Sequence, residues 1–285
     1  MSGYWAGILA ILAINVIFAY GIFITAAAGQ LNLGGAGFMA IGAYAAATLA
    51  EQLGWSPALT VPAAVLVTAL VGFAIAVPVL RTRGVYMVLA TFAFAQVVTG
   101  VILTQPALGG AMGLVVAEYL DLPVLLAAAA GATLLVFWLM ATRFGLALRA
   151  LHDDELVSTL MGVPARAMQV AAFAIGAGLA GLAGGLYAHH FSFVEAQYFS
   201  ALLSIYVLLF VLIGGTQTAW GPLIGASFFT LVPELLRVGG SWRYVAFGVI
   251  IVGMMIFRPE GIVTRTLLAR ILGRRRPAAG AADAR

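Results

Sequence analysis

The stretch AAAGQLNLGGAGFMAIGAY, Ala26–Tyr44, separates two long apolar runs with a glutamine, an asparagine and a cluster of glycines. A membrane-spanning helix needs about 20 consecutive apolar residues, and both neighbouring runs approach that length. Non-helical backbone at membrane depth persists only where protein or water satisfies its N–H and C=O groups. The stretch therefore predicts a helix, a polar break and a second helix inside a membrane protein.

The composition of the whole chain leads to the same class. Of 285 residues, 64% are hydrophobic and only 8% are charged, and the mean hydropathy is +1.10. Soluble domains carry about 25% charged residues, so a chain this long with so few charges cannot cover itself for water. Cysteine is absent, which excludes disulfides and cysteine metal sites, and no segment resembles a cleavable signal peptide. We expect an all-α, polytopic transmembrane helix bundle of about 8–10 spans.

The apolar runs give the expected spans. They are Tyr4–Ala28, Ala36–Leu53, Ala58–Leu80, Gly84–Thr104, Leu122–Ala141, Met168–Ala188, Ala201–Ile213, Pro222–Leu236 and Tyr244–Phe257. The spans that begin at Ala201 and Pro222 are short, which is typical of re-entrant or broken helices. Residues 1–264 form the expected transmembrane domain, with a cytoplasmic loop at about 143–167, and residues 265–285 form a basic cytoplasmic tail that we expect to be disordered at its end.

The basic residues predict the orientation. All of them are arginine, and they gather in one loop, in one polar gap and in the tail: Arg81 and Arg83; Arg143, Arg149 and Arg166; Arg258, Arg265, Arg270 and Arg274 to Arg276. Cytoplasmic loops collect arginine, which explains the high isoelectric point without nucleic acid. We expect a multi-pass membrane protein with its N-terminus outside and its C-terminus in the cytoplasm. Arg237 and Arg243 then fall near the outer face, where Glu234 lies one turn from Arg237.

The polar gap ATRFGLALRALHDDELVSTLMGVPARAMQV predicts a short amphipathic helix over Asp153–Gly162. Asp153 or Asp154 suits the N-cap, and acidic residues, including Glu155, suit the first turn. Gly162 ends the helix and Pro164 starts the next one. Four apolar residues recur at helical spacing and form one stripe: Leu156, Val157, Leu160 and Met161.

An apolar stripe in a cytoplasmic loop must be covered by something. The simpler interpretations are that lipid or the rest of the helix bundle buries this stripe. Helices that lie on a membrane surface usually carry a basic polar face, whereas this one carries Asp153, Asp154 and Glu155. The pattern therefore favours docking into a groove of a cytoplasmic protein.

Several stretches in chain order resemble one known family. They are GQLNLGGAGFMAIGAY, RTRGVYMVLATFAFAQ, the polar gap with the glycine-rich run after it, SIYVLLFVLIGGTQTAWGPLIGA and IFRPEGIV. Together, over residues 29–263, they resemble LivM-type permease subunits of branched-chain amino acid ABC importers. The resemblance implies a heterodimer with a LivH-type sister permease, two cytoplasmic ATP-binding subunits and a periplasmic solute-binding protein, all assembled in the lipid of a bacterial inner (plasma) membrane. It also implies that Asp153–Gly162 is the ATPase-coupling helix, although Leu156, Val157 and Ser158 stand where such loops carry Glu-Ala-Ala.

The family resemblance leaves the solute open, since related permeases import urea and short-chain amides. A stand-alone secondary carrier of small polar solutes is a further alternative. Carriers of that kind often need a charged residue at the bilayer centre, and none is clearly placed there. An intramembrane enzyme would need a nucleophile and a base, which the sequence does not offer.

Polar residues within the spans are candidates for the translocation pathway. Gln30 and Asn32 lie in the break, and Thr91 and Gln96 lie in the fourth expected span. An amide that faces lipid is costly, which favours water or protein around these side chains. Hydrogen bonds between helices are an equal alternative for Thr91 and Gln96. For the glycine-rich run that contains Gly176 and Gly184, the small-residue spacing predicts close helix packing.

Catalytic and cofactor chemistry is not predicted. A phosphate-binding loop needs a lysine, and the chain has none, so ATP must act through another protein. The adjacent His189 and His190 point apart on a helix and are expected to be polar residues at a span end. We predict no enzyme activity, no metal and no cofactor.

Overall fold

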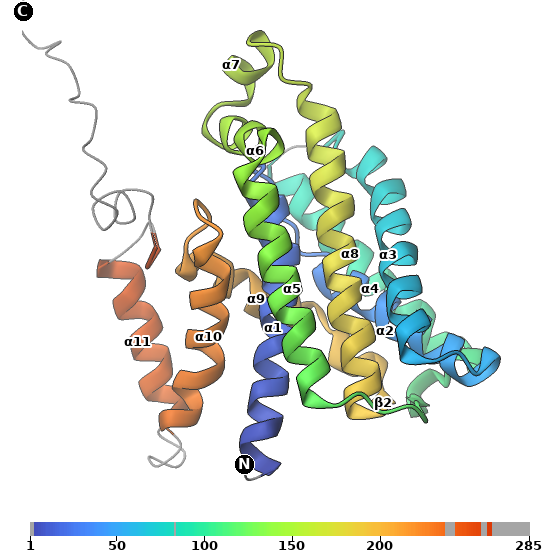
Figure 1. Cartoon of the computed structure of the whole chain (residues 1–285). Helices are drawn as coiled ribbons and strands as arrows, with labels where there is room; N and C mark the ends of the chain where they lie inside the picture. Colours follow the sequence, from blue (N-terminus) through green and yellow to red (C-terminus); the bar gives the residue numbers. More distant parts are fainter. Residues whose placement is uncertain (1–2, 83, 237–242, 258–260, 264–285) are drawn as a thin grey trace, which may run out of the picture.

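The computed structural model describes residues 3–82, 84–236, 243–257 and 261–263. Figure 1 shows a bundle of long helices with the short helix α7 at one end and the start of α1 at the other. The helices are α1 Gly3–Ala26, α2 Gly35–Leu53, α3 Pro57–Val79, α4 Val85–Thr104, α5 Leu122–Ala141, α6 Arg143–Asp153, α7 Glu155–Leu160, α8 Ala165–Phe191, α9 Ala201–Gly214, α10 Trp220–Leu235 and α11 Arg243–Phe257. Short 3-10 helices occupy Pro106–Leu108, Gly110–Met112 and Ala196–Phe199.

The expected all-α bundle is confirmed. Every expected span has a helix at its place, and the boundaries differ by a few residues. Within the described residues, five helices are long and apolar enough to cross a membrane: α1, α3, α4, α5 and α8. The helix α9, at 14 residues, is shorter than a full span, as its sequence indicates. The expected basic tail, residues 265–285, and Arg83, Arg237 and Arg258 lie outside the described residues.

The centre of the bundle is built from α1, α2 and α8, which pack closely along glycines. A Cβ atom added at Gly184 would lie 2.0 Å from the carbonyl oxygen of Met39, and one at Gly42 would lie 2.4 Å from that of Gly181. A Cβ atom at Gly176 would lie 2.5 Å from the carbonyl oxygen of Gly21. Small residues let membrane helices approach at such distances. The packing interpretation of the glycine-rich run is therefore confirmed.

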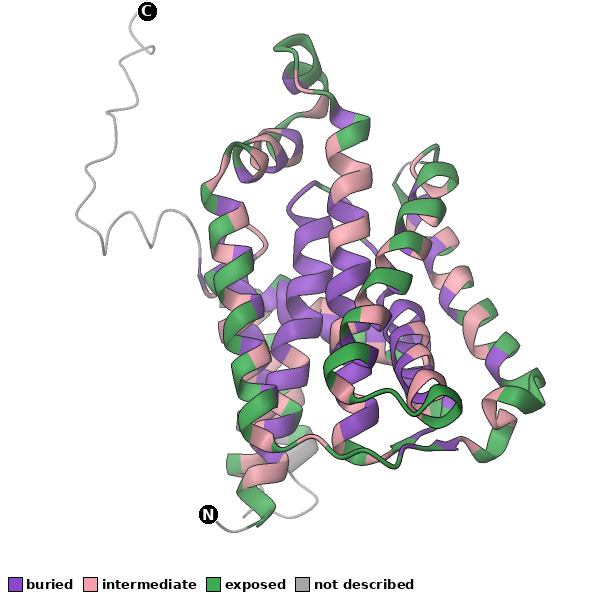
Figure 2. Ribbon diagram, turned by 45° about the vertical axis from the view of Figure 1, so that its right-hand side comes forward, coloured by how far each residue is buried: buried purple, intermediate pink, exposed green. Residues whose placement is uncertain are grey.

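The outer helices carry the apolar surface. Figure 2 shows buried residues along the inner helices and exposed residues on the outward faces of α3, α4 and α5. Leu70 and Leu134 are examples of large apolar side chains that are exposed on these helices. In a soluble protein such faces would be a liability, but in a bilayer they contact acyl chains or another membrane protein.

The end of the bundle opposite α7 is closed by a small sheet and two histidines. Strand β1 (Leu114–Val115) pairs antiparallel with β2 (Phe193–Val194). The His189 ring is fully buried; its Nδ1 donates to the Glu118 carbonyl oxygen at 2.9 Å, and its Nε2 lies 2.7 Å from the Thr60 hydroxyl. Nδ1 of His190 donates to the Leu120 carbonyl oxygen at 2.9 Å. The histidines do lie at a span end, but they fasten the segment after β1 to α8.

Candidate functional site: the break after α1 and the loop before α8

The polar break between α1 and α2 is held by side chains from other helices. The Leu33 N–H donates to the Thr91 hydroxyl of α4 at 3.1 Å, and the Ala36 N–H donates to the Ser204 hydroxyl of α9 at 2.7 Å. The side-chain oxygen of Asn32 accepts the Gly34 N–H at 2.7 Å. These bonds satisfy backbone groups that the missing helix leaves open, as membrane depth requires. Asn32 and Thr91, both buried, thus support the break itself.

Gln30 is placed differently. Its N–H donates to the Thr25 carbonyl oxygen at 3.1 Å, while its side chain, 4% exposed, points into a cavity. Its amide oxygen has no hydrogen-bond partner within the described part of the chain. Beside it, Nδ1 of His152 in α6 donates to the Ala26 carbonyl oxygen at 3.1 Å, which joins the end of α1 to the loop before α8.

Gln96 lies away from the break. It is exposed on α4, and so are Ala93, three residues before it, and Val97, which follows it directly. Its amide therefore faces whatever covers that side of α4, which is lipid or a second membrane protein. The sequence places Gln96 and Thr91 in one helix, but the structure turns them to different sides: Thr91 faces inward and Gln96 faces outward.

The loop before α8 contains two helices where the sequence predicts one. The expected helix, Asp153–Gly162, is shorter in the structure, because Asp153 ends α6 and α7 covers only Glu155–Leu160. Asp154 is the N-cap, and its carboxylate accepts the Val157 N–H at 3.0 Å. Gly162 has a φ of 88°, a left-handed conformation that glycine adopts at no steric cost. Pro164 precedes α8 instead of lying inside its first turn.

The expected apolar stripe of α7 is exposed. The exposed fractions are 72% for Leu156, 49% for Val157, 79% for Leu160 and 81% for Met161. On its other side, α7 turns Ser158 inward, where its hydroxyl donates to the Asp154 carbonyl oxygen at 2.7 Å. Figure 2 shows this exposed helix standing beyond the end of the bundle. The bundle does not cover the stripe, so a partner or the membrane surface must.

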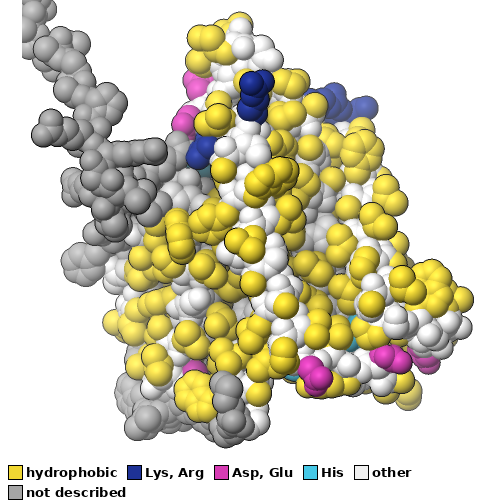
Figure 3. Space-filling model, viewed as in Figure 1, with side chains coloured by type: hydrophobic (Ala, Val, Ile, Leu, Met, Phe, Trp, Pro, Cys, Tyr) yellow, Lys and Arg dark blue, Asp and Glu magenta, His cyan; other side chains and the backbone are white. Residues whose placement is uncertain are grey.

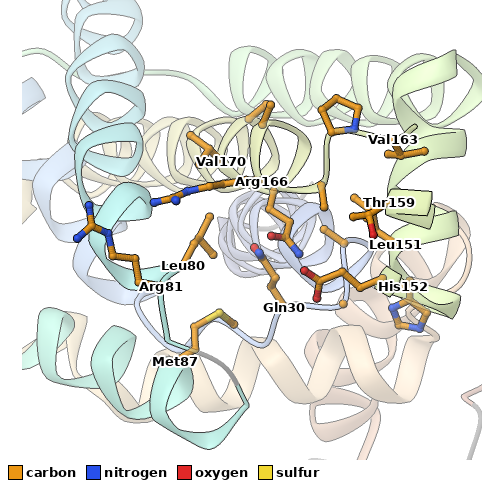
Figure 4. Close-up of a pocket in the computed structure, with 18 of the residues that line it drawn as sticks. Gln30, Leu80, Arg81, Met87, Leu151, His152, Thr159, Val163, Arg166 and Val170 are labelled. Atoms are coloured by element: carbon orange, nitrogen blue, oxygen red, sulfur yellow. The ribbon is translucent and has the colours of Figure 1, made fainter. Parts of the chain in front are cut away.

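A cavity of about 1350 Å³ lies beside this loop. Its walls come from the break after α1, the end of α3, the start of α4, the helices α6 and α7, and the start of α8. Figure 4 shows Gln30 near the middle of this space, with Arg81 and Arg166 on one side and His152 on the other. No pattern in the sequence indicates the cavity. In the sequence, its two arginines indicate only the orientation of the chain in the membrane.

The loop end of the molecule is the basic end. Figure 3 shows arginine side chains gathered at the α7 end of this face, while acidic side chains appear at both ends. Arg81 after α3 and Arg166 in α8 line one cavity, so the loop after α3 and the loop before α8 lie at the same end of the bundle. This agrees with the sequence expectation that both loops are on one side of the membrane.

Apolar helices around a glycine-packed centre, with an exposed amphipathic helix at the basic end, define a polytopic helical membrane protein. Residues 4–258 match the family described as the branched-chain amino acid transport system permease component, and the chain belongs to this family.

Two similar relatives are LivM permease proteins of a high-affinity branched-chain amino acid transport system, from Escherichia coli K12 and Salmonella typhimurium LT2. Each is 29% identical, and each alignment covers 84% of this chain and 64% of the relative. The LsrC permease protein of an autoinducer 2 import system, from Salmonella paratyphi B, is 30% identical over 44% of this chain and 38% of its own length. No solved structure matches.

Proposed function

We propose that the chain is a membrane-spanning permease subunit of an ABC importer whose solute is a branched-chain amino acid. In this proposal α7 binds a separate ATPase and transmits its conformational change to the permease. The observation that carries the proposal is the exposed apolar stripe of α7 at the basic end of the bundle. The family match to residues 4–258 and the LivM relatives support the transport class.

The stripe is large enough to hold a partner. Burial of a leucine or methionine side chain contributes about 1.5–3 kcal/mol when complete, and less when partial. Leu156, Leu160 and Met161 are each more than two-thirds exposed, so most of that contribution is available to a docked protein. Acidic side chains surround the stripe, and the anionic headgroups of the inner leaflet would repel them. The membrane surface is therefore an unfavourable binding partner for the stripe.

The helix is also connected so that it can transmit movement. It follows α6 after a single residue, Asp154, and α8 begins five residues after its end. His152 of α6 is bonded to the last turn of α1, and α8 is packed against α1 and α2 along glycines. A displacement of α7 therefore reaches the central helices through short connections.

The solute path is proposed to run beside the central packing. The close approaches of α8 to α1 and α2 leave no room for an amino acid between them. Exposed amides on outer faces, such as Gln96 on α4, suit a path shared with a LivH-type sister permease. Asn32 and Thr91 hold the backbone of the break after α1 at the side of this path, and Gln30 lines the neighbouring cavity at the loop end.

The orientation follows from the arginines. The α7 end faces the cytoplasm and two ATP-binding subunits, and α1 begins outside, in an inner membrane. The opposite end, with residues 105–123 and 189–200, receives a periplasmic solute-binding protein. Crosslinks from that protein to residues 105–123 are expected, and crosslinks confined to the loops at Arg81 or Arg149 would reverse the orientation.

A second solute class has one observation in its favour. The LsrC relative belongs by name to an autoinducer 2 import system, and it matches 44% of this chain. Urea and short-chain amides are further alternatives within related importers. The LivM relatives cover a larger share of the chain, which favours branched-chain amino acids.

The test is reconstitution of the permease pair and the ATPases in vesicles, with the binding protein outside. Uptake of labelled leucine that requires both ATP and the binding protein is the expected result. Uptake by this chain alone, driven by an ion gradient, would identify a secondary carrier. ATP-driven uptake of urea, an amide or autoinducer 2 in place of leucine would keep the transporter class and replace the solute.

A further inference from the structure

The cavity beside α7 has a hydrogen-bond acceptor that the described residues do not satisfy. The amide oxygen of Gln30 is buried and has no partner among them, and the side chain points into the cavity (Figure 4). An unpaired buried acceptor is costly, and native structures rarely keep one without a bound molecule or water. The position therefore calls for a bound group with an N–H or O–H donor.

The same cavity offers cationic donors. Arg81 and Arg166 both line it, and Figure 4 shows Arg166 extended toward the side where Arg81 lies. One nitrogen of Arg166 donates to the Val77 carbonyl oxygen at 3.4 Å. A guanidinium has five N–H donors in a planar fork, which suits the oxygens of a phosphate. The cavity thus combines arginines that can bind an anion with an amide oxygen that can accept a hydrogen bond from the bound group.

An exposed apolar stripe leads into the cavity along α3. Leu66, Leu70, Phe73 and Val77 are exposed on α3 at helical spacing, and Arg81 follows four residues after Val77. Phe73, Val77 and Arg81 are themselves part of the cavity wall. Where acyl chains cover this face of α3 in a bilayer, the cavity is continuous with the lipid phase.

We propose that the cavity is a phospholipid site. The lipid phosphate binds Arg81 and Arg166, a headgroup N–H donates to the Gln30 amide oxygen, and an acyl chain follows the stripe on α3. Phosphatidylethanolamine fits this pattern, because it carries a phosphate and an ammonium with three donors. Basic pockets between membrane helices on the cytoplasmic side are typical headgroup sites. The volume, about 1350 Å³, is also larger than the roughly 300–1000 Å³ typical of pockets for a small solute.

The lipid would contact the helix proposed to couple ATP hydrolysis. Glu155 and Thr159 of α7 line the cavity, while Leu156 and Leu160 of the same helix are exposed on the outside. An ammonium headgroup also complements the Glu155 carboxylate. This regulatory consequence rests on the proposed function, whereas the binding site itself does not.

The test compares two headgroups that differ only in donors. Phosphatidylcholine keeps the phosphate and the positive charge of phosphatidylethanolamine but replaces its N–H groups with methyl groups. The chain, purified with its native subunits, is exchanged into nanodiscs with equal amounts of both lipids. The lipids that it retains after transfer to detergent are then counted by native mass spectrometry. We expect about fivefold or greater enrichment of phosphatidylethanolamine, and retention of the two lipids in equal amounts would overturn the proposal.

Variants assign the parts of the site. Gln30→Leu should remove the preference between the two lipids while phospholipid is still retained. Arg81→Gln with Arg166→Gln should lose both lipids, and Arg143→Gln, an exposed arginine of α6 outside the cavity, should change neither. An unchanged preference in Gln30→Leu would contradict the donor assignment. Displacement of the lipid by millimolar leucine would assign the cavity to the solute instead. Neither result decides the proposed function, which is tested separately by ATP-driven uptake.

Discussion

The centre of the bundle and the loop before α8 use apolar residues in opposite ways. In the centre, α1, α2 and α8 approach along Gly42, Gly176 and Gly184 until backbone meets backbone, and large side chains of these helices, such as Phe38 and Phe173, are fully buried. In the loop, α7 has only six residues, and its largest apolar side chains are exposed. The first arrangement stabilises the fold of the chain, whereas the second leaves apolar surface for something outside it.

This difference separates effects on folding from effects on function. Substitutions in the centre should change the amount and stability of the folded permease. Substitutions on the outer face of α7 should leave the folded permease intact and change only what it does with its partners.

The largest expected effect is that of Gly184→Ala. The added Cβ would lie 2.0 Å from the Met39 carbonyl oxygen, so α8 and α2 must separate. Overpacking of this kind costs about 1–3 kcal/mol, and sometimes more. We expect a lower yield of monodisperse protein and a lower midpoint of thermal unfolding. Gly131→Ala is the control: a Cβ there meets nothing within 4 Å, so the midpoint should stay or rise. Equal stability of the two variants would break the contrast between centre and surface.

A smaller effect is expected for His189→Leu at the end opposite α7. The substitution removes the donor to the Glu118 carbonyl oxygen and one of the two bonds of the buried Thr60 hydroxyl, which keeps its bond of 3.5 Å to the Pro57 carbonyl oxygen. The cost should therefore lie at the low end of the roughly 1–3 kcal/mol of an unsatisfied buried group. Thermal unfolding should occur at lower temperature, and proteases should cut residues 114–121 faster. The control is His190→Leu, which loses only one bond, to the Leu120 carbonyl oxygen. If proteolysis of this segment is unchanged in His189→Leu, the histidine does not fasten it.

The smallest effect on stability is expected for Asp154→Ala. The substitution removes the cap bond to the Val157 N–H, which is worth about 0.5–2 kcal/mol to a helix. Because α7 is six residues long, the loss should appear as faster hydrogen exchange at residues 155–160 with an unchanged unfolding midpoint. Asp154→Ser, which also caps, should restore protection. A fall in the midpoint as large as that of Gly184→Ala would show that the loop is part of the packed core.

The sequence allowed the fold to be predicted well and the site only in part. Composition and span length predict the bundle, and small-residue spacing predicts the contacts of Gly176 and Gly184, because both patterns are local. The exposed stripe of α7 also follows from helical spacing.

The rest depends on which helices come together. Asn32 and Thr91 accept hydrogen bonds from neighbouring N–H groups of the break, and Thr91 can do so only because α4 packs against it. Gln96 faces outward because of the rotation of the same helix. The cavity joins residues from five helices and a break, and no pattern within one segment could reveal it. The division of the loop into α6 and α7 does not follow from the sequence, because Asp153 and Asp154 suit a helix cap equally well.

The central claim is that the outer face of α7 binds an ATPase, and Leu160→Glu tests it most directly. Leu160 is 79% exposed, so the charge costs the isolated permease little. In a docked interface the same charge would lose packing and hydration, and each 1.4 kcal/mol lowers affinity about tenfold. ATP-driven uptake by the assembled importer should fall by about tenfold or more, with unchanged insertion and thermal stability of the permease. The nearly isosteric Leu160→Met should retain uptake. Full ATP-driven uptake by Leu160→Glu would contradict the account and move the coupling contact to another loop, that of residues 81–84 first.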